Sequence, residues 1–448
     1  MYPDTIFELP SLDRTSFVLP ARFLKEVSQL PAYIANNTHS TCDQFFIGTW
    51  TTLDYDIFGP ASIEAIRKQY ISKIGQQIGP ASLEAAHAFH QQFSRYPDWT
   101  PIAAQPKVLR TIGQMVARTV VGPEICRDPQ WVESVIGYAQ GVFSAAVYMK
   151  MVPKVMWPLM ALFTPYLYRI YKYRRRIRRM AAPLIRQRLA WYREQPEFWA
   201  ARMKSGGEMS TLDWLIESSP PEEATLEMLT HRLIGVSFAG THTASNHVAN
   251  CILDLAADFD RWAPLLREEI TNVLGPDPTS ITNAQLARMW KLDSFMKEVQ
   301  RFHPPAKLST NRTLLEPHTL SSGDSFPKDV HLCFAGVPMS MSEEYLGADA
   351  QHFDGFRFER MRRDPQQEHN GLQFTSSYAG SLHFGHGRQM CPGRFMGSLV
   401  SKLVTIELLR RYDFKLRDGE VRRPANMMLF DMDFPNPTYE VLFRDRKL

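Results

Sequence analysis

The pattern of hydrophobic and polar positions predicts a mainly helical chain with small β-sheets at its edges, an α+β arrangement. Apolar residues recur at helical spacing from about Ile63 to His303, and residues 20–29 form an earlier candidate helix with Pro20 near its start. Residues 224–256 predict one long helix whose second half is apolar on nearly all sides. Such a helix belongs in the centre of the fold.

Short strands are expected towards both ends of the chain. Ile6–Val18 and His318–Phe334 have strand-like patterns, and the second surrounds the turn signal Ser321–Asp324. The tail, Met427–Phe443, is strand-like with proline breaks. Because no internal repeat or low-complexity linker interrupts the chain, we expect a single domain over residues 1–448.

Composition narrows the class of protein. Hydrophobic residues make up 44% and charged residues 22%, both ordinary for a globular protein, and a net charge of +4 gives no reason to expect a nucleic-acid partner. The odd number of cysteines and the lack of a CxxC pair disfavour a disulfide framework or a zinc finger, and they fit a reducing compartment. The five cysteines are Cys42, Cys126, Cys251, Cys333 and Cys391.

One basic segment has three interpretations. Tyr168–Arg179 is rich in Arg and Tyr, which suits a solvated helix face, a nucleic-acid contact or a membrane-surface patch. The charge-free stretch before it, Val155–Tyr168, is too short to span a bilayer but could dip into lipid while the arginines meet anionic headgroups. The solvated face is favoured, and peripheral membrane contact remains a second hypothesis.

The residues around Cys391 carry the strongest chemical signal. A metal-binding thiolate needs a dry loop that turns backbone N–H groups towards the sulfur, and such a loop needs glycine at its tight turns. Gly385, Gly387 and Gly393 supply these turns, and Pro392 predicts a helix that begins at the cysteine. Two alternatives are a free cysteine in a glycine-rich turn, and a zinc ion held by Cys391 with two nearby histidines, His383 and His386.

This segment resembles the haem-binding loop of the cytochrome P450 family. Phe384, Gly387, Cys391 and Gly393 fall on that family's pattern Phe-x-x-Gly-x-x-x-Cys-x-Gly. The resemblance implies haem b held by Cys391 as the metal ligand, with the other three residues shaping the cofactor loop. The chain departs from the family two residues before the cysteine, where Gln389 replaces an Arg or His that meets a haem propionate. Arg388 is a candidate for that charge.

A second match lies in the predicted central helix. Ala239-Gly240-Thr241-His242-Thr243 resembles the family's oxygen-activation segment, with His242 in place of the usual acid. Close packing is the alternative explanation for small residues on one helix face. A Thr243 hydroxyl can bond the carbonyl four residues earlier and position a proton donor, and histidine can relay protons near neutral pH. The resemblance therefore implies catalytic roles for Thr243 and His242.

Further motifs follow in the family's order. Glu298-x-x-Arg301 resembles its Glu-x-x-Arg helix, and Phe353–Phe358 resembles the later segment whose arginine, here Arg357, completes a buried charge cluster. Arg312 lies where the family often places a propionate-binding arginine, although a solvent-facing arginine is an equal alternative.

The family's Trp-x-x-x-Arg pattern is missing from the early helix near Ile63. Trp99 does not restore it, because Ala103 stands four residues later. Arg67 and Lys68 are the candidates for the charge that this pattern would supply.

The resemblance implies the cytochrome P450 fold, with haem between the long central helix and the Cys391 loop. The implied function is monooxygenation of an apolar small molecule, a terpenoid, polyketide or alkaloid intermediate of fungal secondary metabolism, with electrons from an NADPH-dependent flavoprotein reductase. The same haem catalysing dehydration, isomerisation or oxidative coupling is the first alternative, and a non-catalytic haem protein is the second.

Location is a further expectation from the resemblance. Fungal members usually begin with a membrane anchor before the first strand, whereas this chain starts at that strand. We therefore expect a full-length form at the endoplasmic reticulum membrane surface and a soluble or peripheral form for the chain as given.

Overall fold

The computed structural model describes residues 4–10, 14–45, 55–204, 209–275, 281–365 and 371–447. Its described α-helices, in chain order, are α1 (Leu24–Gln29), α2 (Asn37–Gln44), α3 (Pro60–Glu64), α4 (Ile74–Gln92), α5 (Ala104–Val121), α6 (Pro129–Lys150), α7 (Trp157–Phe163), α8 (Pro165–Glu194), α9 (Pro196–Lys204), α10 (Thr211–Ser218), α11 (Leu226–Ala257), α12 (Phe259–Leu274), α13 (Asn283–Arg288), α14 (Trp290–Phe302), α15 (Gly336–Ser340), α16 (Glu343–Leu346), α17 (Arg357–Arg363) and α18 (Arg394–Arg411). Short 3-10 or π segments are η1 (Ala21–Phe23), η2 (Tyr55–Phe58), η3 (Ala65–Tyr70), η4 (Lys154–Met156) and η5 (Gly387–Gln389).

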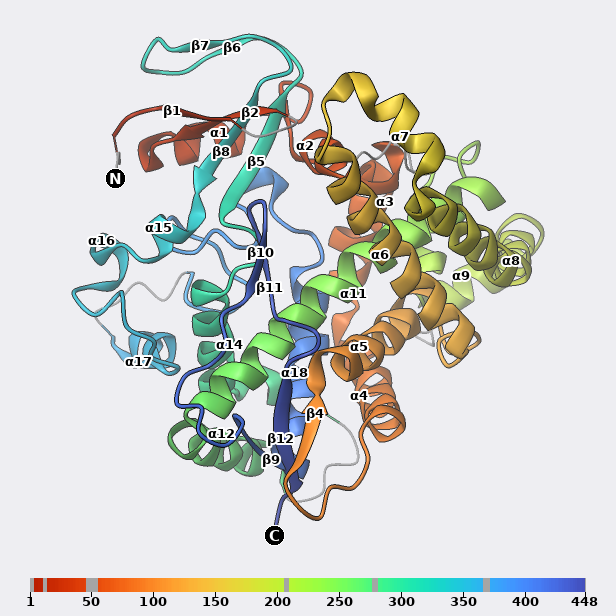
Figure 1. The fold of residues 1–448 in the computed structure, drawn as a ribbon. Helices are drawn as coiled ribbons and strands as arrows, with labels where there is room; N and C mark the ends of the chain where they lie inside the picture. The colour runs from red at the N-terminus through yellow and green to blue at the C-terminus, as the bar shows by residue number, and fades with distance from the viewer. Residues whose placement is uncertain are drawn as a thin grey trace.

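The sheets are small and lie at the periphery, as predicted. The strands are β1 (Phe7–Pro10), β2 (Thr15–Leu19), β3 (Ala35–Asn36), β4 (Thr100–Ala103), β5 (Leu308–Leu314), β6 (His318–Thr319), β7 (Ser325–Phe326), β8 (His331–Ala335), β9 (Tyr412–Lys415), β10 (Met427–Leu429), β11 (Met432–Phe434) and β12 (Glu440–Asp445). The largest sheet has the order β1-β2-β8-β5-β3, in which only β2 and β8 run parallel, and a second sheet has the order β4-β12-β9. Figure 1 shows the first sheet on one side of the helical body and the second near the C-terminus.

The long central helix is confirmed. Thr225 caps α11 by accepting a hydrogen bond from the Met228 amide at 3.2 Å. The helix runs diagonally through the middle of the molecule and packs against α5, α6, α8 and α18 (Figure 1). Most of its side chains are buried, so the hydrophobic effect fixes it from all sides.

Local boundaries follow the residues expected to set them. The early helix appears as η1 and α1 directly after Pro20. The predicted strand over Ile6–Val18 is instead the antiparallel pair β1–β2, and residues 11–13 between them lie outside the described residues. Among the helices described, none combines the length and apolar content needed to cross a bilayer.

Candidate active site

The loop before Cys391 folds back and closes on the cysteine. The Cys391 amide donates to the Phe384 carbonyl at 2.8 Å. Gly385 and Gly387 both have φ of +70°, the left-handed region that favours glycine, so the expected tight turns are confirmed at these two positions. Gly393 differs, because its φ of −84° suits any residue and a Cβ there would meet nothing within 4 Å, so the prediction that this position needs glycine was wrong.

Backbone donors and cations surround the Cys391 sulfur. The amides of Gly393 and Arg394 hydrogen-bond to it, and the charges of Arg394 and Arg67 also favour the thiolate. Burial outweighs these effects and raises the pKa of the free thiol above its ordinary value. The helix α18 begins at Arg394, three residues after the cysteine where its start was predicted. A sulfur that faces several hydrogen-bond donors and cations suits a thiolate that binds a metal ion.

Arg67 holds the same loop from the η3 segment. Its Nη2 donates to the Arg388 carbonyl at 2.8 Å and to the Met390 carbonyl at 2.9 Å. Lys68 instead forms a surface ion pair with Glu64 at 2.8 Å. Of the two candidates for a charge near this loop, the structure brings only Arg67 to it.

The central helix α11 has exposed residues where it carries the second motif, Ala239–Thr243. Ala239 and Thr243 are exposed, although α11 is otherwise mostly buried, and they follow one another by one helical turn. Thr243 donates to the Ala239 carbonyl at 2.8 Å, the bond expected from the sequence. A Cβ placed on Gly240 would lie 3.0 Å from the Met396 side chain at the start of α18. The open stretch of α11 therefore lies close to the segment that follows Cys391.

Comparison with known proteins agrees with this geometry. The cytochrome P450 family model matches residues 85–443, most of the chain. The chain belongs to the cytochrome P450 family. The structure also resembles retinoic acid-bound cyanobacterial CYP120A1, with a TM-score of 0.70 and 16% identity over 98% of this chain and 92% of that one, which shows the shared fold.

Several curated relatives are fungal proteins. Cytochrome P450 monooxygenase penP of Penicillium crustosum is 31% identical over 99% of this chain and 83% of its own length. Cytochrome P450 monooxygenase AN1598 of Emericella nidulans is 29% identical over 99% and 81%, and paxP of Penicillium paxilli is 30% identical over 99% and 84%. The expected family, fold and enzyme class, an oxidoreductase of the monooxygenase type, are confirmed.

The family implies haem, and a buried cation on β5 fits one of its carboxylates. Arg312 is 1% exposed, and among the described residues its guanidinium reaches only the carbonyls of Asn311 and His386, at 2.8 and 3.4 Å. Within the described part of the chain its Nε has no hydrogen-bond partner, and burial lowers the pKa of the Arg312 guanidinium to about 10. No carboxylate pairs with Arg312 among the residues that the structure describes. A buried, unpaired guanidinium suits a propionate that arrives with the cofactor.

A bulge in β5 lies directly before the buried Arg312. The register between β5 and β8 shifts between Ser309 and Arg312, and Thr310 has φ of +52°, which is rare for a β-branched residue. Such local strain often marks a functional position. The solvent-facing alternative for Arg312 is excluded by its burial.

Gln389, the residue that departs from the family's haem-loop pattern, forms hydrogen bonds that support the fold. The Gln389 side chain accepts from the Asn37 amide at 2.8 Å and donates to the Ala35 carbonyl at 2.7 Å. Gln389 therefore fastens the cofactor loop to β3 and α2. Its amide does not take the place of the Arg or His that meets a haem propionate in the family. The Arg388 side chain is exposed, so the structure places Arg67 and Arg312, rather than Arg388, as the held cations of this region.

The two histidines considered as zinc ligands lie within hydrogen-bond distance of serine hydroxyls instead. His386 Nδ1 lies 3.0 Å from Ser377 Oγ, and His383 Nε2 lies 3.1 Å from Ser381 Oγ. The described part of the chain contains no group of three or more His, Cys, Asp or Glu side chains that could hold a metal ion. The thiolate ligand of the P450 family therefore explains Cys391 better than zinc.

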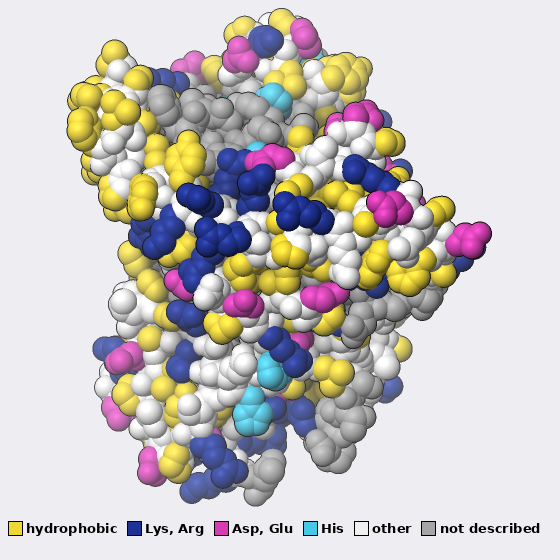
Figure 2. Space-filling view, turned by 90° about the vertical axis from the view of Figure 1, so that its right-hand side faces the viewer, with side chains coloured by type: hydrophobic (Ala, Val, Ile, Leu, Met, Phe, Trp, Pro, Cys, Tyr) yellow, Lys and Arg dark blue, Asp and Glu magenta, His cyan; other side chains and the backbone are white. Residues whose placement is uncertain are grey.

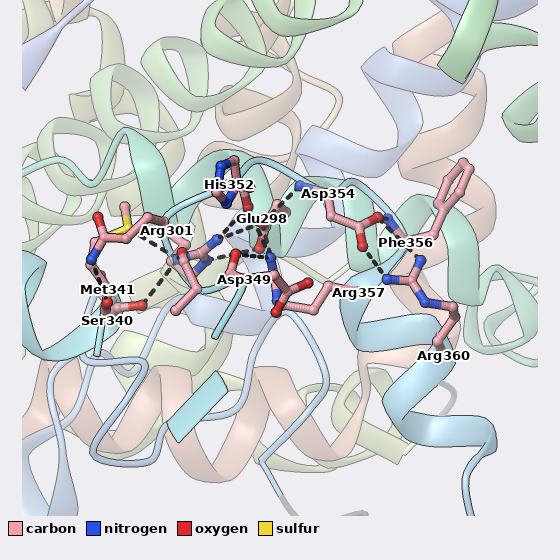
Figure 3. Close-up of polar contacts among 12 residues, drawn as sticks. Glu298, Arg301, Ser340, Met341, Asp349, His352, Asp354, Phe356, Arg357 and Arg360 are labelled. Carbon is pink, nitrogen blue, oxygen red and sulfur yellow. Dashed lines mark hydrogen bonds and ion pairs between the residues drawn. The ribbon is translucent and has the colours of Figure 1, made fainter. Parts of the chain in front are cut away.

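The predicted buried charge cluster is present. Arg301 forms two bonds to Glu298, at 2.6 and 2.8 Å, and Arg357 Nε lies 3.4 Å from the same carboxylate. The three side chains are 1%, 0% and 4% exposed. Figure 3 shows that Arg301 and Arg357 also bind backbone carbonyls of the segment between α15 and α17, including those of Asp349 and His352. The cluster thus fixes α14 to this segment.

Asp293 is a supporting residue that the sequence did not reveal. It lies on α14, pairs with Lys402 on α18 and accepts from the Phe374 amide at 2.8 Å. The ring of Phe374 packs edge-on against Phe384 at 5.5 Å. Asp293 therefore connects α14 to both sides of the cofactor loop. An acid within a helix is usually a surface residue, so no local signal distinguished it.

Proposed function

We propose that this cytochrome P450 is a haem-thiolate monooxygenase that oxidises an apolar small molecule in fungal secondary metabolism. The observation that carries the proposal is the donor-lined sulfur of Cys391, together with the open stretch of α11 at Ala239 and Thr243 that lies next to the segment after the cysteine. Bound haem supplies the activation of molecular oxygen and the transfer of one oxygen atom to the substrate. The Cys391 loop holds the metal ligand, and α11 provides an exposed face.

The chain's own residues have distinct proposed roles. Cys391 ligates the metal, and Phe384 and Gly387 shape its loop. Arg312 neutralises a cofactor carboxylate. Thr243 donates its O–H hydrogen bond to the Ala239 carbonyl, so its oxygen is left as an acceptor that would hold a water molecule at the open face of α11. Electrons come from an NADPH-dependent flavoprotein reductase.

The relatives support oxygen insertion over the alternatives. All three fungal relatives described above carry the name monooxygenase, and none is named for dehydration, isomerisation or coupling. Incubation with oxygen-18 gas separates these reactions, because only insertion places the label in the product.

The first test is the difference spectrum of the dithionite-reduced protein with and without carbon monoxide. We expect a strongly red-shifted Soret band, because Cys391 remains a thiolate when it ligates the iron. A band at the position typical of neutral-thiol or histidine ligation would contradict the proposal.

We also propose that the protein contacts the endoplasmic reticulum membrane through one face, here named the α7–α8 surface. Its apolar part consists of the exposed side chains Val155, Leu159, Leu162 and Phe163, which are 53–85% exposed. Its basic part consists of the exposed residues Arg169, Lys172, Arg175 and Arg179 on α8. Figure 2 shows Lys and Arg side chains gathered beside hydrophobic ones on the side of the molecule that carries these helices.

Charge and spacing support this contact. The apolar residues recur at helical spacing, and the four basic residues follow one stripe of α8. None of these four forms an ion pair with a described residue, whereas Arg174 and Arg176 pair with Glu227 and Glu133. Exposed apolar side chains beside free cations suit the headgroup region of an anionic membrane.

We expect the double variant Arg175→Glu/Arg179→Glu to float poorly with vesicles rich in phosphatidylserine. Each basic residue near such a surface contributes about 1 kcal/mol, so reversing two charges should weaken binding at least tenfold. The control Arg422→Glu/Lys447→Glu has the same charge change in the C-terminal segment and should float normally. Equal flotation of both variants would contradict the proposal.

A further inference from the structure

A cavity of about 310 Å³ lies between the helices α4, α13 and α18. Asp293 of α14 and Arg362 of α17 also line it, and so do Gln373 and Thr375 in the segment that leads to the cofactor loop. The volume falls at the lower end of the range typical of small-molecule sites. Because α13 and α18 both pack against α4, the walls of the cavity support one another.

This cavity is separate from the proposed active site. Phe395, Leu399 and Lys402 of α18 line it, and their spacing of four and three residues places them on one face of that helix. Met396 lies on another face and approaches α11, since a Cβ on Gly240 would be 3.0 Å from its side chain. The cavity and the open stretch of α11 therefore lie against different faces of α18.

The charges that line the cavity leave one positive charge in excess. Lys402 and Arg362 both form an ion pair with Asp293, and the side chains of Lys402, Arg362 and Asp293 are 10%, 11% and 8% exposed. Among the described residues that line the cavity, Asp293 is the only acid. A charge held largely away from water is stabilised by a partner of opposite sign, so the cavity favours an anionic ligand.

Arg362 has hydrogen-bond donors to offer such a ligand. Its Nη1 donates to Asp293 at 3.3 Å, whereas its Nε and Nη2 have no partner among the described residues, and neither atom is fully buried. The guanidinium stacks over the ring of Trp290 at 4.4 Å, which holds its plane in place. Guanidinium N–H groups match the two oxygens of a carboxylate.

The rest of the lining is largely apolar. Ile74 and Ile78 of α4, Leu286 of α13, and Phe395 and Leu399 of α18 all contribute to it. An inorganic anion would leave these side chains uncovered, whereas a hydrocarbon body attached to the anionic group would remove them from water.

We propose that this cavity binds a small organic acid, whose carboxylate accepts hydrogen bonds from Arg362 and Lys402 and whose apolar body packs against α4, α13 and α18. The ion pairs with Asp293 hold both cations in position before the ligand arrives, which lowers the cost of binding. The ligand carboxylate supplies the second negative charge that the two cations lack. This site lies outside the proposed oxidation chemistry and does not depend on it.

The test uses three probes that separate charge from apolar contact. Isothermal titration calorimetry of the haem-loaded chain measures binding of 2-naphthoate, of its uncharged analogue 2-naphthamide, and of acetate, which lacks the rings. We expect 2-naphthoate to bind at least tenfold more tightly than either analogue, because hydrogen bonds between charged groups and burial of the rings both contribute.

Two substitutions alter the cavity in different ways. Arg362→Gln removes the charge but keeps an N–H donor near Asp293, and it should weaken 2-naphthoate binding about tenfold with little effect on 2-naphthamide. Ala287→Trp adds a ring at the exposed rim on α13 without changing any charge, and it should weaken both naphthyl probes at least tenfold. The second variant keeps the test valid if the first one folds poorly.

Each substitution has a matched control on the same helix. Arg363 is 63% exposed and does not line the cavity, so Arg363→Gln should bind 2-naphthoate like the wild type. Ala284 is exposed on α13 but is not part of the lining, so Ala284→Trp should also bind normally.

Equal affinity for 2-naphthoate in the wild type, Arg362→Gln and Ala287→Trp would overturn the inference, because it would place the probe elsewhere, such as beside the haem. Absence of 2-naphthoate binding to the wild type would overturn it as well. A red-shifted carbon monoxide band in the same wild-type sample would show that the haem-thiolate proposal stands in either case.

Discussion

The variant Arg301→Ala is expected to yield little or no haem-loaded protein. Arg301 is 1% exposed and forms two bonds with Glu298, whose carboxylate is completely buried. Among the described residues, removing the guanidinium leaves that carboxylate with one remaining cation, Arg357, whose Nε lies 3.4 Å away. Breaking one partner of a buried ion pair costs about 3–5 kcal/mol, a large part of the stability of an ordinary domain.

The loss should extend to the cofactor loop. Arg301 also donates to the carbonyls of Ser340 and Ala350, at 3.1 and 2.6 Å, so it anchors the chain that leads from β8 towards Cys391. On the same helix, Lys297 is fully buried and donates to the carbonyls of Gln373 and Ser376, at 2.9 and 3.1 Å. The helix α14 is therefore a common support for the residues before the cofactor loop.

Haem content per protein and the denaturation midpoint measure this effect. The control is Arg360→Ala, which removes an arginine that pairs with Asp354 but is 58% exposed. Surface pairs contribute about 0–1 kcal/mol, so this variant should bind haem normally. Normal haem content in Arg301→Ala would contradict the structural role of the cluster.

Features encoded within one segment were predictable from the sequence. The range 224–256 matches α11 (Leu226–Ala257) closely, because helical periodicity and a capping threonine lie next to each other in the chain. The Cys391 loop was readable for the same reason, since its ligand, glycines and following helix occupy about ten consecutive residues. The charge cluster could be predicted from the spacing of Glu298 and Arg301 and from one arginine later in the chain.

Features assembled from distant segments were not predictable. The strand β5 was missed because its partner strands β3 and β8 supply the pairing, and its bulge at Thr310 breaks the alternation that marks a strand. Arg67 and Lys68 are adjacent cations of similar local context, and only the folded chain shows that Arg67 reaches the cofactor loop.

The same limit applies to a group of packed phenylalanine rings and to Gln389. The rings of Phe45, Phe143 and Phe238 pack against one another although these residues are far apart in the chain, and no periodicity connects them. Gln389 departs from the family pattern, but its bonds to residues about 350 positions earlier show that it supports the fold. Its scaffold role is set by tertiary contacts and leaves no trace in the local sequence.

The variant Gly387→Ala is expected to destabilise the cofactor loop strongly. Gly387 has φ of +70°, and a Cβ there would lie 2.5 Å from the Ser28 carbonyl oxygen of α1. The left-handed backbone costs a residue with a Cβ about 1–2 kcal/mol, and forcing an atom into a packed site costs about 1–3 kcal/mol more. Because the nearest atom belongs to the backbone, the clash is relieved only by moving the loop away from α1.

Gly385→Ala is the matched control for this prediction. Gly385 has the same φ of +70°, but the nearest atom to its Cβ would be 3.6 Å away, an ordinary contact. This variant should therefore lose only about 1–2 kcal/mol of stability, the cost of the left-handed backbone. Urea denaturation and haem retention of the two variants measure the difference. Equal losses would show that loop conformation alone matters, whereas a larger loss in Gly387→Ala would show that the cofactor loop is held in place by its contact with α1.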